Sequence, residues 1–214
     1  MQYKGIEQIY TSRFMSAFWA GNYTKAGEWL ELASALPSSK TPKIQLIYRT
    51  FFSALLVFWR YRQGDGEECL AQGETILEKM KLWSNNSNAI FENKLLLIES
   101  EWYACSCNIV AAKESYVLSA KSARDHGLIN EQGLAFELYG NFLSSIGDLA
   151  ATQFYQKAHS CYIQWGALAK AKKLQKNLNL DLTESVSCSL NSSLSISKRS
   201  RGKEEDLLEK PSFR

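Results

Sequence analysis

Turn signals recur along this sequence at a nearly constant spacing, and no other feature limits the fold so strongly. Glycine or asparagine interrupts helical stretches near Gly21, Gly64, Asn108 and Gly147, which lie about 40 residues apart. Each interval is long enough for two helices, so the repeating unit is a pair of helices. One pair cannot bury both of its faces, whereas stacked pairs can. The sequence therefore predicts an all-α, right-handed solenoid of about four antiparallel helical hairpins.

Apolar residues recur at helical intervals between these turns. Ile6, Tyr10, Phe14 and Phe18 follow one another every four residues, which places them on one face of a helix. A second helix is expected to end near Pro37. Further helices are predicted over roughly residues 42–62, 67–82, 89–106, 110–126, 130–146 and 149–165, with a last short one over 167–178. No proline interrupts the chain between residues 48 and 180, which suits long helices.

The composition changes near residue 183. Residues 183–200 contain eight serines and no aromatic residue, and the segment KRSRGKEEDLLEK that follows 197 is densely charged. A segment with so few bulky apolar residues cannot form a packed core. We therefore expect a helical repeat domain over residues 1–182 and a Ser-rich, charged, disordered tail over residues 183–214. The basic start of the charged segment is either an ordinary solvated tail or a nuclear signal.

Composition and charge narrow the class of protein. Of 214 residues, 45% are hydrophobic and 22% are charged, as in soluble globular domains, and the net charge of +3 does not indicate nucleic-acid binding. The first residues, MQYKGIEQIY, lack the apolar core of a signal peptide. The most apolar run, FFSALLVFW, is nine residues long, whereas a membrane-spanning helix needs about 20. We interpret that run as a buried helix, and we expect a cytoplasmic protein without membrane or nucleic-acid partners.

The residue patterns of common enzymes and metal sites do not occur in this sequence. There is no GxxxxGK[ST] loop to hold phosphates and no HRD or DFG set of a protein kinase. The five cysteines are odd in number and lack zinc-finger spacing, so we interpret them as reduced thiols. His126, next to Arg124, fits the C-terminal end of a helix, and His159 fits structural packing better than a phospho-acceptor. The sequence predicts no enzyme and no catalytic, cofactor-binding or metal-binding residue.

Small and aromatic residues alternate on one predicted helix face near residue 150. Gly140 lies in one helix, and Ala151, Tyr155 and Ala158 follow on the next at spacings of four and three residues. Small residues let two helix backbones approach, and the aromatic ring fills the neighbouring groove. This pattern resembles the tetratricopeptide repeat, so the resemblance implies a tetratricopeptide-like stack of hairpins.

A longer stretch, over residues 80–175, is similar to the helical-repeat region of large multidomain signalling kinases. Those proteins join a protein-kinase-like domain, a predicted ATPase, helical repeats, a GAF sensor and a histidine kinase. The matching pieces are Asn93, Lys94, Leu95, Leu96, Leu97, Glu99, Glu101, Gly127, Leu128, Asn130, Glu131, Gln132, Leu134, Ala135, Glu137, Leu138, residues 162–167, Ala169 and Lys170. The motifs of the catalytic domains do not accompany them, so the resemblance implies the repeat region without its kinase or ATPase neighbours.

Three functions follow as expectations. The first is a non-catalytic protein–protein interaction and regulatory module of a signal-transduction system, which binds a protein or peptide through the concave face of the solenoid. The alternative is a regulatory fragment of a histidine or serine/threonine kinase that acts with kinase or ATPase domains on another chain. A third is a small-molecule sensor with its site in the groove. An unpartnered first helix could also drive self-association.

Overall fold

The computed structural model describes residues 5–36, 42–84, 88–176 and 178. For residues 88–90 it describes the backbone alone. Every regular element within these residues is a helix, which confirms the all-α prediction. The helices are α1 (Ile6–Trp19), α2 (Tyr23–Ser34), α3 (Lys43–Arg62), α4 (Gly66–Ser84), α5 (Asn88–Cys105), α6 (Ile109–Asp125), α7 (Ile129–Ser145) and α8 (Ala151–Trp165). Residues 168–176 are also helical.

The chain divides into two compact units, Met1–Ala171 and Lys172–Arg214. The second unit is described only at residues 172–176 and 178. All contacts discussed below therefore belong to the first unit. The predicted domain boundary after residue 182 and the predicted tail over residues 183–214 lie outside the described residues and stay predictions.

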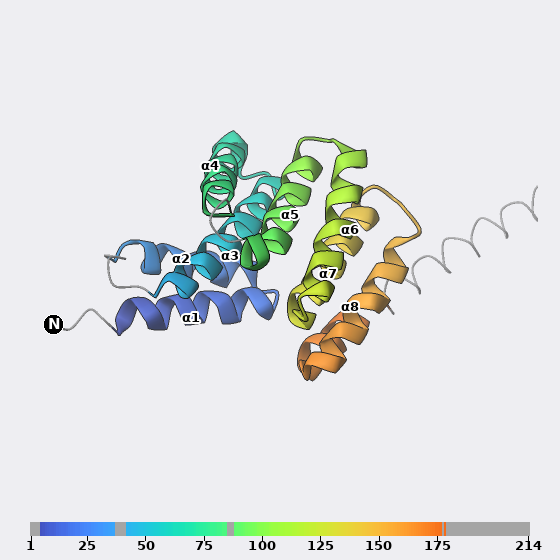
Figure 1. Cartoon of the computed structure of the whole chain (residues 1–214). Helices are drawn as coiled ribbons and strands as arrows, with labels where there is room; N and C mark the ends of the chain where they lie inside the picture. Colours follow the sequence, from blue (N-terminus) through green and yellow to red (C-terminus); the bar gives the residue numbers. More distant parts are fainter. Residues whose placement is uncertain (1–4, 37–41, 85–87, 177, 179–214) are drawn as a thin grey trace, which may run out of the picture. The chain divides into compact units, whose positions relative to one another are not determined.

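Helices that follow one another in sequence pack most closely in pairs. The most extensive contacts join α1 with α2, α3 with α4, α5 with α6, and α7 with α8, so the described residues of the first unit form four helical hairpins (Figure 1). The predicted turns near residues 21, 64, 108 and 147 lie inside these four hairpins. Pairing of sequence neighbours through short loops is the expected arrangement for a repeat of two helices.

The turns inside the hairpins share one backbone pattern. A residue with positive φ precedes Asn or Asp in each: Gly21-Asn22, Gly64-Asp65, Cys107-Asn108 and Gly147-Asp148. The Asn side chains cap the following helix, since Asn22 Oδ1 accepts from the Lys25 amide at 3.1 Å and Asn108 Oδ1 from the Ala111 amide at 3.2 Å. Glycine adopts the left-handed conformation readily, whereas Cys107 holds it at φ 58° despite its side chain.

The apolar run of α3 forms the centre of the core. Its buried residues are Phe51, Phe52, Ala54, Leu55, Leu56, Val57 and Phe58, each at most 3% exposed. Helices α1, α2, α4 and α5 all contact α3. The prediction that this run is buried inside a helical protein is therefore confirmed. Across the described part of the chain, no helix is long and apolar enough to cross a membrane.

The first helices of the hairpins also contact one another. Helix α3 packs against α1 and α5, and α5 packs against α7. Among the described residues, no comparable contact joins α2 with α4, α4 with α6, or α6 with α8. The first helices of neighbouring hairpins therefore lie closer to one another than the second helices do. We call α1, α3, α5 and α7 the inner helices, because each contacts the first helix of a neighbouring hairpin.

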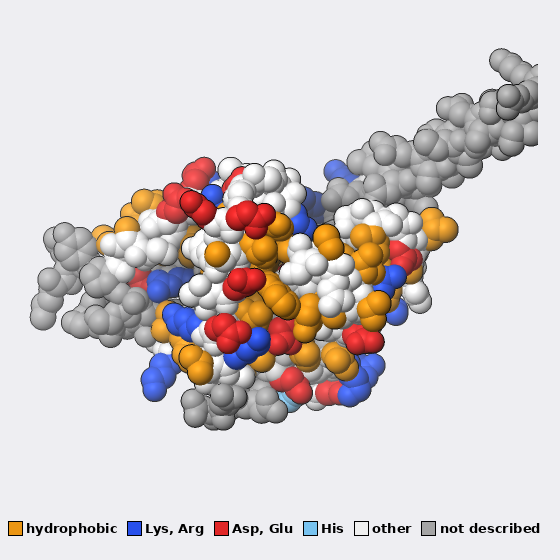
Figure 2. Space-filling model, turned by 90° about the horizontal axis from the view of Figure 1, so that it is seen from above, with side chains coloured by type: hydrophobic (Ala, Val, Ile, Leu, Met, Phe, Trp, Pro, Cys, Tyr) orange, Lys and Arg blue, Asp and Glu red, His pale blue; other side chains and the backbone are white. Residues whose placement is uncertain are grey.

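The surface carries charges of both signs. On the face shown in Figure 2, acidic and basic side chains are interspersed with hydrophobic ones, and no large area of one sign gathers there. This face therefore lacks the continuous basic stripe with which nucleic-acid-binding proteins attract a phosphate backbone.

Candidate functional site

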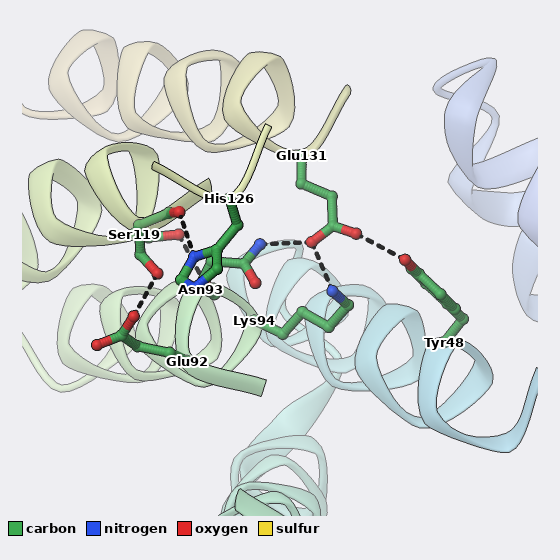
Figure 3. Close-up of polar contacts among 8 residues, drawn as sticks. Tyr48, Glu92, Asn93, Lys94, Ser119, His126 and Glu131 are labelled. Atoms are coloured by element: carbon green, nitrogen blue, oxygen red, sulfur yellow. Dashed lines mark hydrogen bonds and ion pairs between the residues drawn. The ribbon is translucent and has the colours of Figure 1, made fainter. Parts of the chain in front are cut away.

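A buried ion pair and its hydrogen-bond partners join three of the inner helices (Figure 3). Lys94 of α5 and Glu131 of α7 are each 1% exposed, and Nζ lies 2.7 Å from Oε2. Tyr48 of α3 donates its hydroxyl to Glu131 Oε1 at 2.9 Å, and Asn93 donates its amide to Oε2. A buried charge is tolerated only when it is paired and hydrogen-bonded. We call these four residues the Glu131 cluster, and it fixes α3, α5 and α7 against one another.

A second buried carboxylate lies further along α5. Glu101 is 1% exposed, and its Oε2 lies 2.5 Å from Arg62 Nη2 at the end of α3. Tyr116 of α6 donates its hydroxyl to Glu101 Oε1 at 2.6 Å. Burial and the nearby Glu101 carboxylate raise the pKa of Tyr116 well above its ordinary value, so its hydroxyl remains a donor. The Arg62 side chain is 31% exposed and therefore also reaches solvent.

A third cluster joins the last hairpin to the first. Lys170 Nζ lies 2.8 Å from Glu137 Oε2, and Tyr162 donates its hydroxyl to the same oxygen. The Lys170 ammonium also lies 5.8 Å from the ring centre of Trp19 in α1. Trp19 packs on Trp165, at the end of α8, with ring centres 5.1 Å apart. The two ends of the four-hairpin stack therefore meet through side chains.

A hollow of about 300 Å³ lies among the inner helices. Helices α1, α3 and α7 line it together with the first residue of α2. Its apolar lining is Phe18, Leu55, Leu138 and the rings of Tyr23 and Trp59, and its polar lining is Arg62, Gln63, Asn141 and Ser145. Because α1 and α7 belong to the first and last hairpins, the hollow exists only when all four hairpins are stacked.

The protonation states and hydrogen-bond partners of Tyr23, Arg62 and Cys105 determine what the hollow can do chemically. Burial, then the Glu137 and Glu101 carboxylates, raise the pKa of Tyr23, so its hydroxyl stays protonated. Arg62 uses Nη2 on Glu101 and Nη1 on the Cys105 sulfur at 3.8 Å. Burial raises the pKa of the Cys105 thiol to about 11, so Cys105 is a neutral thiol at neutral pH. This arrangement can bind a compact group, and it lacks an activated nucleophile.

The two histidines lie in separate places. His126 is exposed at the C-terminal cap of α6, as the sequence predicts, and its Nδ1 lies 2.8 Å from the Ser122 carbonyl oxygen. Ser122 donates its hydroxyl to Glu92 Oε2 at 2.6 Å. His159 is half-buried on α8. Among the described residues, no group of three or more His, Cys, Asp and Glu side chains is placed to hold a metal ion.

Residues that carry the sequence resemblance converge in the three clusters. Asn93, Lys94 and Glu131 come from two separate matching pieces and meet in the Glu131 cluster. Glu101, Glu137, Tyr162 and Lys170 supply the other two clusters. The matching residues therefore hold hairpins together, and most of the residues that line the hollow lie outside the matching pieces.

Sequence reasoning did not identify the hollow. Arg62 and Trp59 stand out in the sequence only as the end of an apolar helix, and Tyr23 as the residue after a turn. No spacing rule joins them to Asn141 and Ser145, because the stacking of the hairpins brings them together. In comparisons with family models, curated proteins and solved structures, the chain matches none.

Proposed function

We propose that this chain is a non-catalytic protein–protein interaction module of a signalling system, built as a right-handed, tetratricopeptide-like solenoid. The partner binds on the face of the inner helices and inserts one compact group into the hollow. The observation that carries this proposal is the hollow itself, a concave site that combines aromatic walls with a few polar groups.

The chemistry of the lining supports binding rather than catalysis. Tyr23 and Trp59 are aromatic, and Arg62 is a guanidinium held in place by a buried carboxylate. Tyrosine, tryptophan and arginine are the residue types that dominate binding energy at protein interfaces. Tyr23 and Trp59 pack with ring centres 5.0 Å apart, so each ring restricts the rotamers of the other before a partner binds. A rigid site loses less conformational entropy on binding than a mobile one.

A pull-down with a blocked hollow tests this proposal. Ser145→Trp places a large ring at an exposed position of the lining while keeping the Arg62–Glu101 pair. Ser144→Trp is the matched control, because Ser144 is the exposed neighbour that does not line the hollow. We expect the full chain and the control to retain the same protein from cytosol, and Ser145→Trp to lose it. Equal recovery by all three folded proteins would show that partners bind elsewhere.

The alternative is a regulatory fragment that acts with kinase or ATPase domains on another chain. It rests on the resemblance to multidomain signalling kinases, whose matching residues contribute side chains to each of the three clusters. This alternative predicts that the retained protein is a kinase or ATPase in stoichiometric amount, identified by mass spectrometry. Stoichiometric recovery of proteins from other classes would instead favour a general adaptor.

A further inference from the structure

We infer that the hollow binds a small, uncharged, flat ring that carries carbonyl oxygens, the chemistry of an oxo-purine base or of its nucleoside, guanosine. This inference rests on the proposed function only in assigning binding to the same hollow. It concerns a free small molecule rather than a protein partner, and it is tested on the chain alone.

The walls of the hollow favour a flat ring. Tyr23 and Trp59 lie side by side in the wall, with ring centres 5.0 Å apart and ring planes tilted by 48°. Phe18 is 2% exposed and packs against Tyr23, with ring centres 5.1 Å apart. Tyr23 and Trp59 are half-buried, so part of each ring remains open to a ligand. Heterocyclic bases stack on aromatic side chains of this kind, and each stacking contact contributes about 1–3 kcal/mol in nucleic-acid complexes.

The charges around the hollow favour an uncharged ligand. The Arg62 guanidinium is paired with Glu101 at 2.5 Å, and the Glu137 carboxylate is paired with Lys170 at 2.8 Å. The C-terminal ends of α1, α3 and α7 also contribute lining residues, among them Phe18 and Ser145. Helix C-termini carry partial negative charge, which opposes phosphates and carboxylates. The hollow therefore has no surplus positive charge to hold an anion.

The hydrogen-bonding groups favour a ligand that presents acceptors. Arg62 has further N–H donors beyond those used on Glu101 and Cys105. Asn141 Oδ1 already accepts from the Tyr155 hydroxyl at 2.9 Å, so the Asn141 side chain has its amide N–H groups left to offer. Arginine donates to the O6 and N7 atoms of guanine in protein–DNA complexes. The O6 and N7 edge of an oxo-purine matches the donors of Arg62 and Asn141.

The size of the hollow limits the ligand. Its volume of about 300 Å³ is at the lower end of small-molecule sites, which span about 300–1,000 Å³. A base or nucleoside suits this volume better than a dinucleotide.

Isothermal titration calorimetry of the full chain with guanosine tests the inference. We expect guanosine to bind, and adenosine, which lacks the O6 acceptor, to bind about tenfold more weakly. GMP is expected to bind no more tightly than guanosine, because the hollow has no surplus positive charge. Ser145→Trp is expected to weaken guanosine binding at least about tenfold by filling the site, and Ser144→Trp to leave it unchanged.

Three results would overturn the inference. They are no guanosine binding at millimolar concentration by folded protein, unchanged binding in Ser145→Trp, and GMP binding tenfold or more tighter than guanosine. Circular dichroism melting curves of both variants establish that they are folded. Loss of the pull-down partner in Ser145→Trp without guanosine binding leaves the proposed function standing and rejects this inference. Guanosine binding without a pull-down partner would support this inference and reject the proposed function.

Discussion

Lys94 and Glu131 show how charged residues stabilise contacts between hairpins. Each is 1% exposed, and their ion pair is completed by the Tyr48 hydroxyl and the Asn93 amide. Desolvation of two charges offsets much of their attraction, so such a pair adds little net stability compared with apolar residues. Removing one member is costly, because the other charge stays buried. The pair therefore penalises any stacking of α5 and α7 that separates the two groups.

Glu131→Gln is expected to lower the free energy of unfolding by about 3–5 kcal/mol, because Lys94 loses its buried carboxylate. Asp125→Asn is the control, since it breaks the exposed Lys121–Asp125 pair at 2.8 Å and should cost less than about 1 kcal/mol. Urea unfolding measures both variants. Similar small losses in the two would mean that the Lys94–Glu131 pair is hydrated in solution.

Cys107→Gly is expected to raise the free energy of unfolding by about 1 kcal/mol. Cys107 has φ 58°, a conformation that disfavours any residue with a β-carbon. The three equivalent hairpin turns have glycine there. Cys107→Ala is the matched control, because it removes the thiol and keeps the β-carbon. Equal stabilisation by both variants in urea unfolding would point to the thiol rather than to the backbone.

Pairs of helices approach closely where glycine faces an aromatic ring. A β-carbon at Gly140 of α7 would lie 2.7 Å from Tyr155 Cδ1 of α8, and one at Gly133 would lie 2.9 Å from Tyr162 Cε1. The sequence pattern of Gly140, Tyr155 and Ala158 predicts this packing, and the contact of Gly140 with Tyr155 confirms it. Within α7, glycine is thus a packing residue despite its low helix propensity.

Gly140→Ala is expected to lower the free energy of unfolding by about 1–3 kcal/mol, because the Tyr155 ring must move to admit a methyl group. Gly27→Ala in α2 is the control, since nothing lies within 4 Å of a β-carbon there. That substitution should stabilise the protein by up to about 1 kcal/mol through helix propensity alone. Thermal or urea unfolding measures the change in the free energy of unfolding, which should have opposite signs in the two variants. Stabilisation by both substitutions would contradict close packing at Gly140.

The first unit as a whole is a stack whose ends meet. Trp19 in the first hairpin packs on Trp165 at the end of the last, and Lys170 lies near the Trp19 ring. In an open row of repeats, each hairpin interacts only with its neighbours. The additional contact couples the terminal hairpins to each other.

A double-mutant cycle of Trp19→Ala and Trp165→Ala measures this coupling. We expect an interaction energy of about 0.5–1.5 kcal/mol in urea unfolding, the range for an aromatic pair. The control cycle pairs Trp165→Ala with Trp29→Ala, because Trp29 stacks on Tyr10 within the first hairpin. That cycle should give no coupling. Additive losses in the Trp19 cycle would show that the ends of the stack do not touch in solution.

The helices and their turns were predictable from sequence because their causes are local. Apolar residues at helical intervals place α1, and the buried run of α3 follows from its length and its flanking arginines. Glycine followed by Asn or Asp marks three hairpin turns directly. Cys107 escaped this reasoning, since the left-handed residue of the third turn is not glycine and only Asn108 signalled the turn.

The convergence of side chains was decided by the tertiary structure alone. Asn93 and Lys94 lie in one matching piece of sequence and Glu131 in another, yet nothing local indicates that Tyr48 joins them. The hollow likewise needs Tyr23, Arg62 and Asn141 from three different helices. Helix formation depends on neighbours a few residues apart in the chain. The stacking of hairpins depends on the packing of many side chains from different helices. That packing determines which polar groups meet.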